Sequence, residues 1–144
     1  MIEHQDLNRR SFLKSTGAVA VGVAILSQRA AARVGPSERI RVGCIGVGGM
    51  GTSRLKEFIR QDDCEVVAVC DVKRPNRDRA AALVDKHYGK KLCTAYNDFR
   101  ELCARDDIDA VVIASTDHWH VLQALEAVRA GKDVYCEKPL GLSV

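Results

Sequence analysis

The residues best suited to chemistry begin with a glycine-rich loop at residues 46–51, which follows an apolar run at residues 39–45 and precedes a segment of helical spacing. In such a strand–loop–helix unit, Gly46 allows a tight turn, Gly48 lets the backbone approach a pyrophosphate, and Gly51 lets the helix pack closely on the strand. The first N–H groups of the helix would attract the phosphates. The residues predicted to bind a dinucleotide here are Gly46, Gly48, Gly49, Met50 and Gly51.

An acidic residue, Asp71, stands 20 residues after the last glycine of the loop, at the end of a second apolar run. A carboxylate at this place can accept hydrogen bonds from the ribose hydroxyls of NAD. Lys73 and Arg74 beside it could instead meet the 2′-phosphate of NADP, but Asp71 would repel that phosphate, so NAD is preferred and NADP stays open. A flavin could use the same glycines, and Asp71 could simply cap a helix.

Two further polar clusters follow later apolar runs: residues 115–120, Ser-Thr-Asp-His-Trp-His, and residues 137–139, Glu-Lys-Pro. Ligands of open parallel sheets bind outside the carboxyl ends of the strands, which is where all these segments would lie. They are therefore predicted to share one site with the glycine loop. The pair His118 and His120 has no evident third ligand, so no metal site is predicted.

The elements that must position these residues alternate along the chain, which predicts an α/β fold with a doubly wound parallel sheet, the Rossmann NAD(P)-binding fold. Asn97 is the expected cap of the helix that carries Phe99, and Gly131 is expected to end the last helix. Four segments of helical periodicity separate five predicted strands, at residues 39–45, 65–70, 92–95, 110–114 and 133–136.

Composition excludes several other functions. The 144 residues suit one domain, and the net charge of +3 gives no electrostatic case for binding nucleic acid. The six cysteines include no Cys-x-x-Cys pair, and those in apolar runs are expected to be buried hydrophobes rather than metal ligands or disulfides.

The amino-terminal segment has the order of a targeting sequence: a basic stretch at residues 8–14, an uncharged apolar run at 15–26, and alanines up to Ala32. Arg9-Arg10-Ser-Phe-Leu-Lys resembles a twin-arginine signal, which predicts export to the periplasm by the twin-arginine machinery. A buried amino-terminal helix is the alternative. The expected organisation is a signal peptide at 1–32, a linker at 33–39 and a dinucleotide-binding domain at 40–144.

Taken together, these motifs resemble the Gfo/Idh/MocA family of oxidoreductases across residues 40–140, except that family members commonly have proline where Thr116 stands. The resemblance implies hydride transfer between NAD and a sugar or polyol. It also implies that Lys138 is an active-site residue, with His120 as the second catalytic candidate. Four residues complete the cofactor site that it implies: Ser115, His118, Glu137 and Lys138.

Family members continue beyond the Glu-Lys-Pro segment into an α+β substrate domain, which is absent from this chain, and the complete protein is expected to be a homo-oligomer. Two interpretations stay open: the cofactor-binding part of an exported oxidoreductase, inactive alone because half of the site is missing, or a catalytically inactive nucleotide-binding remnant. A redox sensor is less favoured, since the cysteines lack a reactive context. The DNA downstream of Val144 would separate the first two.

Overall fold

Short runs rich in valine and isoleucine form the centre of the fold. The computed structural model describes residues 38–141, so the expected signal peptide and most of the expected linker lie outside the described residues. Side chains on both sides of β2 are buried, as expected of a strand covered by helices on both faces. The five strands, all parallel, are β1 (Ile40–Ile45), β2 (Cys64–Cys70), β3 (Thr94–Tyr96), β4 (Ala110–Ile113) and β5 (Asp133–Cys136).

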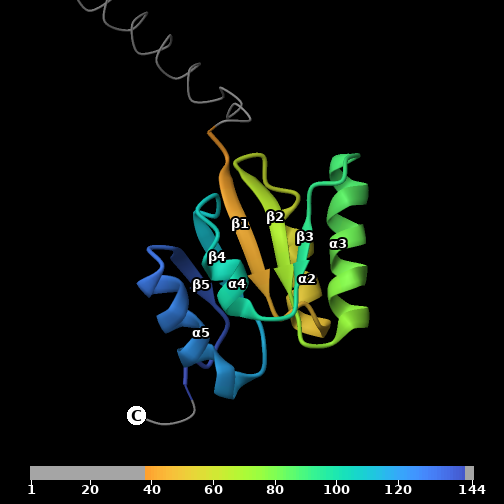
Figure 1. Cartoon of the computed structure of the whole chain (residues 1–144). Coiled ribbons are helices and arrows are strands. Elements are labelled where there is room, and N and C mark those ends of the chain that lie inside the picture. The colour runs from red at the N-terminus through yellow and green to blue at the C-terminus, as the bar shows by residue number, and fades with distance from the viewer. Residues whose placement is uncertain (1–37, 142–144) are drawn as a thin grey trace, which may run out of the picture. The chain divides into compact units, whose positions relative to one another are not determined.

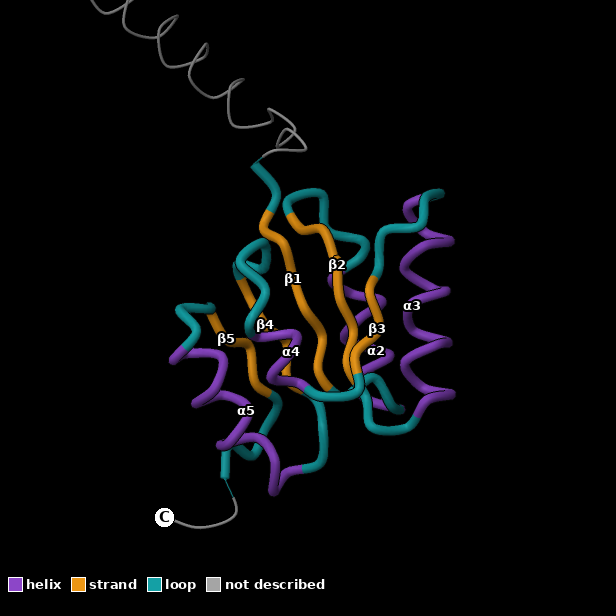
Figure 2. The backbone as a smooth tube through the Cα atoms, in the orientation of Figure 1, coloured by secondary structure: helices purple, strands orange, loops and turns teal. Residues whose placement is uncertain are grey.

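The helices between the strands pack on the two faces of the sheet (Figures 1 and 2). Leu55 of α2 and Val84 of α3 belong to one buried cluster, whereas Leu102 of α4 and Ala127 of α5 belong to a second. The doubly wound sheet is thereby confirmed. No helix within residues 38–141 is long and apolar enough to cross a membrane. The helices are α2 (Gly49–Phe58), α3 (Arg74–Tyr88), α4 (Phe99–Cys103) and α5 (Asp117–Arg129).

The order of the strands creates the site. It runs β3-β2-β1-β4-β5, so the direction of winding reverses at β1, and ligands of such sheets bind at that point. Ile45 at the end of β1 pairs with Cys70 on β2 and with Ile113 on β4, which brings three strand ends level. These carboxyl ends lie at the lower edge of the sheet in Figure 1.

The glycine loop turns from β1 into α2 at very close range. Gly46 has a φ of +78°, a backbone region that favours glycine, and a Cβ there would lie 2.4 Å from the backbone nitrogen of Ser115. A Cβ on Gly51 would lie 1.7 Å from the carbonyl oxygen of Gly46. Both glycines are therefore required by the fold itself, as the turn and packing roles predicted.

Two predicted boundaries were wrong for identifiable reasons. The third strand begins at Thr94 rather than Leu92, because the backbone nitrogens of Leu92 and Cys93 donate to Asp85 Oδ1 (both 2.8 Å) instead of entering the sheet. The cap of α4 is Asp98 rather than Asn97: the Asp98 carboxylate accepts from the backbone nitrogen of Arg100 at 2.9 Å. Asn97 instead accepts from the Arg77 guanidinium at 3.1 Å. The five strands and the end of α5 before Gly131, with φ +73°, are confirmed.

The close approach of α2 to β1 can be tested by adding one carbon atom. Gly51→Ala is expected to lower the free energy of unfolding by about 3 kcal/mol or more, because the new methyl group meets backbone that cannot move aside. Gly49→Ala is the matched control, since a Cβ there has no atom within 4 Å, and it should change stability by less than about 0.5 kcal/mol. Urea unfolding followed by circular dichroism measures both; equal effects would contradict the packing role.

Candidate functional site

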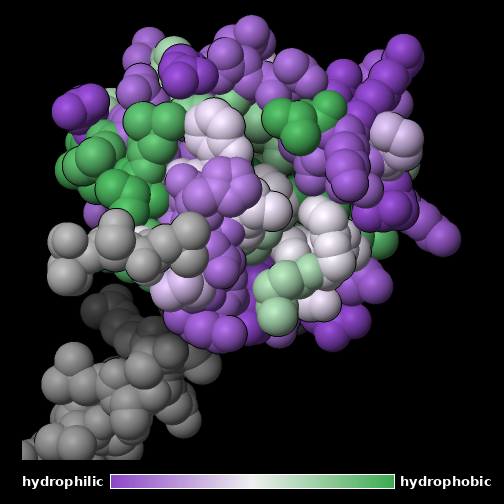
Figure 3. Space-filling view, turned by 90° about the horizontal axis from the view of Figure 1, so that it is seen from below, coloured by the Kyte–Doolittle hydropathy of each residue, from purple (hydrophilic) through white to green (hydrophobic). Residues whose placement is uncertain are grey.

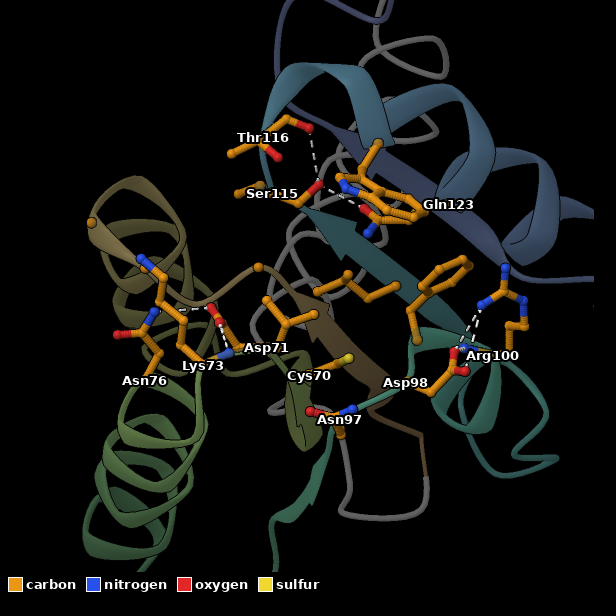
Figure 4. Close-up of a pocket in the computed structure, with 18 residues that line it drawn as sticks. Cys70, Asp71, Lys73, Asn76, Asn97, Asp98, Arg100, Ser115, Thr116 and Gln123 are labelled. Atoms are coloured by element: carbon orange, nitrogen blue, oxygen red, sulfur yellow. Dashed lines mark hydrogen bonds and ion pairs between the residues drawn. The ribbon is translucent and has the colours of Figure 1, made fainter.

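A cavity of about 490 Å³ opens at the carboxyl ends of β1, β2 and β4 (Figure 4). The view onto this end of the molecule shows a mainly hydrophilic rim, with hydrophobic side chains gathered on the side where α5 lies in Figure 1 (Figure 3). Five of the residues predicted to bind the cofactor line the cavity: Gly46, Gly48, Gly49, Asp71 and Ser115.

The middle of the glycine loop presents open backbone to this cavity. A Cβ on Gly48 would find only the amide nitrogen of Asn76, at 3.9 Å, and one on Gly49 would find nothing within 4 Å. The helical hydrogen bonds of α2 begin with Thr52 N donating to Gly48 O at 2.9 Å. The N–H groups before Thr52 therefore have no partner within the helix and suit an anion. Met50 is exposed and lies outside the cavity lining.

Asp71 joins the end of β2 to the glycine loop. Its Oδ2 accepts from the backbone nitrogen of Val47 at 3.1 Å and from the Asn76 amide at 3.2 Å, and its Oδ1 accepts from the backbone nitrogen of Lys73 at 2.8 Å. An ionised carboxylate offers about four lone-pair directions, so one stays available for a ribose hydroxyl. Asn76, which the sequence reasoning missed, both orients this carboxylate and lines the cavity.

Another wall of the cavity is aromatic. The guanidinium carbon of Arg100 lies 4.5 Å from the ring centroid of Phe99, and the Phe99 and Trp119 rings meet edge to face at 6.2 Å. Asp98 beside them has a lowered pKa, chiefly because its carboxylate accepts the backbone N–H of Arg100. Residues 97–100 follow the end of β3, so the same strand-end rule that selected the other clusters would have found them.

The loop between β4 and α5 contributes Ser115 to the cavity, whereas the first turn of α5 holds the two predicted histidines outside the cavity lining. Ser115 Oγ donates to Gln123 Oε1 at 2.7 Å. His118 is exposed, with Nε2 3.5 Å from Thr116 Oγ1, and Thr116 has a φ of −75° that a proline would also adopt. His120 is only 1% exposed and does not line the cavity.

The Glu-Lys-Pro segment also lies outside the cavity lining. Glu137 forms an ion pair with Arg54 of α2, a second residue that the sequence reasoning missed, and it accepts from the Tyr135 hydroxyl at 3.4 Å. The Arg54 hydrogen bond is the main reason that the pKa of Glu137 is lowered. Lys138 is exposed, and its ammonium has no hydrogen-bond or ion-pair partner within residues 38–141.

The cysteine thiols have no feature that would make them reactive. All six are free thiols; five are buried and Cys136, predicted to be buried, is half-buried. Burial raises the pKa of Cys70 and of Cys93 to about 12, which keeps both protonated at neutral pH and argues against a thiolate-based sensor. Within the described residues, no group of three or more His, Cys, Asp or Glu side chains could hold a metal ion.

A Rossmann fold with an open glycine loop and a carboxylate at the end of β2 defines a dinucleotide-binding domain. Residues 40–144 match the Gfo/Idh/MocA family model, described as "Oxidoreductase family, NAD-binding Rossmann fold". The chain belongs to this family, and its cofactor is NAD. Residues 6–25 match the twin-arginine translocation signal sequence, so the chain carries a signal for export to the periplasm.

Curated relatives are similar to nearly the whole chain. "Glycosyl hydrolase family 109 protein 1" of Shewanella sp. (strain MR-4) is 36% identical over 160 residues, which cover 96% of this chain and 35% of that protein. "Alpha-N-acetylgalactosaminidase" of Shewanella oneidensis is 34% identical with the same coverage. The chain therefore spans about a third of the length of these relatives.

Solved structures of similar fold include scyllo-inositol dehydrogenase of Lactobacillus casei with bound NAD(H) and scyllo-inositol. It is 28% identical with a TM-score of 0.65, over 73% of this chain and 29% of that one. A probable dehydrogenase of Thermotoga maritima is 33% identical with a TM-score of 0.60, over 72% of this chain and 29% of that one.

The ion pair between Arg54 and Glu137 predicts a pH-dependent stability. A carboxyl group whose pKa is lowered in the folded state stabilises that state above its unfolded pKa, and the effect is lost as the pH falls through the folded pKa. Glu137→Gln should lower the urea midpoint at pH 7, and the difference from the unsubstituted chain should shrink as the pH falls below about 4. Asp78→Asn, in the exposed pair with Arg74, should have little effect at any pH. A Glu137→Gln difference that is independent of pH would contradict the assignment.

Proposed function

We propose that this chain is the cofactor-binding domain of an exported oxidoreductase that transfers hydride between NAD and a sugar or polyol. The observation that supports it best is the open backbone at Gly48, which faces the cavity beside the anchored carboxylate of Asp71. No protein contact requires a glycine at that position. A ligand that packs against the backbone there does require one.

Different residues of the cavity would take the different parts of NAD. The free N–H groups at the start of α2 would bind the pyrophosphate, and the remaining lone pair of Asp71 would accept from a ribose hydroxyl. The aromatic wall at Phe99 and Trp119 suits a flat base. Bound NAD would supply the hydride acceptor or donor.

Lys138 is the residue we assign to proton transfer. An alcohol that loses a hydride must also lose its hydroxyl proton, and an amine near the reacting carbon can accept it. The Lys138 ammonium is exposed and unpaired among the described side chains, which leaves it available for that role. Ser115 and His118 would face the same end of the site, and Glu137, held by Arg54, would set the position of Lys138, which follows it.

The substrate class rests on the relatives. The neighbour from Lactobacillus casei was solved with scyllo-inositol, a polyol, and the Shewanella oneidensis relative is named for an N-acetylated sugar. The latter name supports a second candidate function, an NAD-dependent glycosidase; hydrolases of this kind exist outside the usual two-carboxylate scheme. This relative is 34% identical to the chain, and the inositol dehydrogenase 28%.

Cofactor binding can be tested on the chain directly. NAD⁺ at about 100 times its Kd should stabilise the protein by about 2.7 kcal/mol, measured as a rise in the thermal unfolding midpoint. Gly48→Val should abolish this rise, because the added side chain occupies ligand space, and the nearest protein atom to its Cβ is 3.9 Å away. Ala82→Val, on the exposed side of α3, is the control and should keep the full rise. A rise that survives in Gly48→Val would exclude this loop as the phosphate site.

Asp71 makes a separate prediction about the choice of cofactor. NADP⁺ should bind at least about tenfold more weakly than NAD⁺, since the carboxylate repels a 2′-phosphate. Asp71→Asn removes that charge and should bring the two affinities closer together. Titration calorimetry of the unsubstituted chain and of Asp71→Asn with both nucleotides measures the ratio of the NADP⁺ and NAD⁺ dissociation constants. An unchanged ratio would show that Asp71 does not face the 2′ position.

The reaction is tested on the product of the longest reading frame that contains this chain. Accumulation of NADH with inositols or free sugars supports the dehydrogenase. Release of the sugar from an α-N-acetylgalactosaminide, dependent on NAD⁺ but without net NADH, supports the glycosidase. NAD binding without either reaction on a panel of sugars and polyols would favour a nucleotide-binding remnant.

A further inference from the structure

The His120 ring is enclosed by backbone at both of its nitrogens, unlike a histidine that acts at the surface or on a substrate. Its ring is buried, Nδ1 lies 2.7 Å from the carbonyl oxygen of Pro139, and Nε2 lies 3.1 Å from the carbonyl oxygen of Ser115. Carbonyl oxygens only accept hydrogen bonds, so each contact is a hydrogen bond when that ring nitrogen carries the hydrogen, and the tautomer decides which nitrogen does. Both polar atoms of the side chain are thus committed to backbone.

The two carbonyls belong to the two segments that flank the reacting end of the site. Ser115 follows β4 and lines the cavity, and its hydroxyl is fixed by the buried Gln123. Pro139 directly follows Lys138. On the other side of Lys138, the backbone nitrogen of Glu137 donates to Ile113 O at 2.9 Å, which completes the β4–β5 pairing. The residues on either side of Lys138, Glu137 and Pro139, are therefore both fixed through contacts of their backbone atoms. The Lys138 side chain itself has no partner among the described residues.

We propose that His120 is a positioning residue: its ring bridges Ser115 O and Pro139 O and thereby sets where Lys138 stands relative to the cavity. This inference rests on the proposed function for the role of Lys138. It replaces direct catalysis by His120 with an action through its neighbour, because a buried ring with both nitrogens against backbone carbonyls offers no atom to a substrate.

Two substitutions separate the two bonds. The amide nitrogen of His120→Asn occupies the place of Nδ1 and can still donate to Pro139 O, whereas that of His120→Gln occupies the place of Nε2 and can still donate to Ser115 O. His120→Leu removes both. A purely structural need for a polar side chain of this size would make the Asn and Gln variants behave alike.

Two quantities are measured: the rate of backbone hydrogen exchange around Lys138, and the protection of the Lys138 amine from labelling. Hydrogen exchange of peptides covering residues 137–141 should quicken about tenfold in His120→Leu and His120→Gln, the factor that one lost hydrogen bond of ordinary strength allows. His120→Asn should stay near the unsubstituted rate. NAD⁺ should protect Lys138 from an amine-labelling reagent in the unsubstituted chain and in His120→Asn, but less in the other two. His87→Asn, at the far end of α3, is the control.

Equal exchange in the Asn and Gln variants, both folded by circular dichroism, would overturn the proposal. So would a ¹⁵N–¹H spectrum of the imidazole in which Nδ1 is bare, since Pro139 O would then have no donor. Exchange requires no cofactor, so a chain that fails to bind NAD⁺ but shows the Asn–Gln difference would reject the proposed function and keep the positioning role.

Discussion

The contact between α2 and the end of β1 is the constraint on which the rest of the structure depends. Gly51 lies so close to the carbonyl of Gly46 that no side chain fits between them, and Gly46 in turn lies against the backbone of Ser115. One loop therefore fixes the distance from β1 to α2 and from β1 to the segment after β4. The cavity is the space that this packing leaves at the level ends of three strands.

Two further contacts extend from this loop and its helix α2. Asp71 fastens the end of β2 to Val47, and Arg54 of α2 fastens the start of the Glu-Lys-Pro segment through Glu137. The glycine loop and α2 thus contact, through Val47 and Arg54, both the part of the site suited to a ribose and the segment that carries Lys138. Residues 97–100 take part in neither contact, and they contribute Phe99 to the aromatic wall from the β3 side.

The fold and about half of the site could be predicted from sequence because they depend on local patterns. Apolar runs, glycine spacing and a carboxylate at a strand end each act within a few residues. The rest depends on contacts across the chain. His120 and Glu137 are polar residues in the right segments, yet only the fold shows that their partners within the protein include Pro139 and Arg54. The shift of β3 has the same origin, since Asp85 competes for the N–H groups of residues 92 and 93.

The three hydrogen bonds that Asp71 accepts from Val47, Lys73 and Asn76 have a thermodynamic consequence for binding. A carboxylate on a free rotamer must be ordered when a ligand arrives, and that ordering subtracts from affinity. Here folding has already ordered it, and the residue lines the cavity. The ribose would meet a preorganised acceptor, so the entropy of fixing this side chain belongs to folding and not to association.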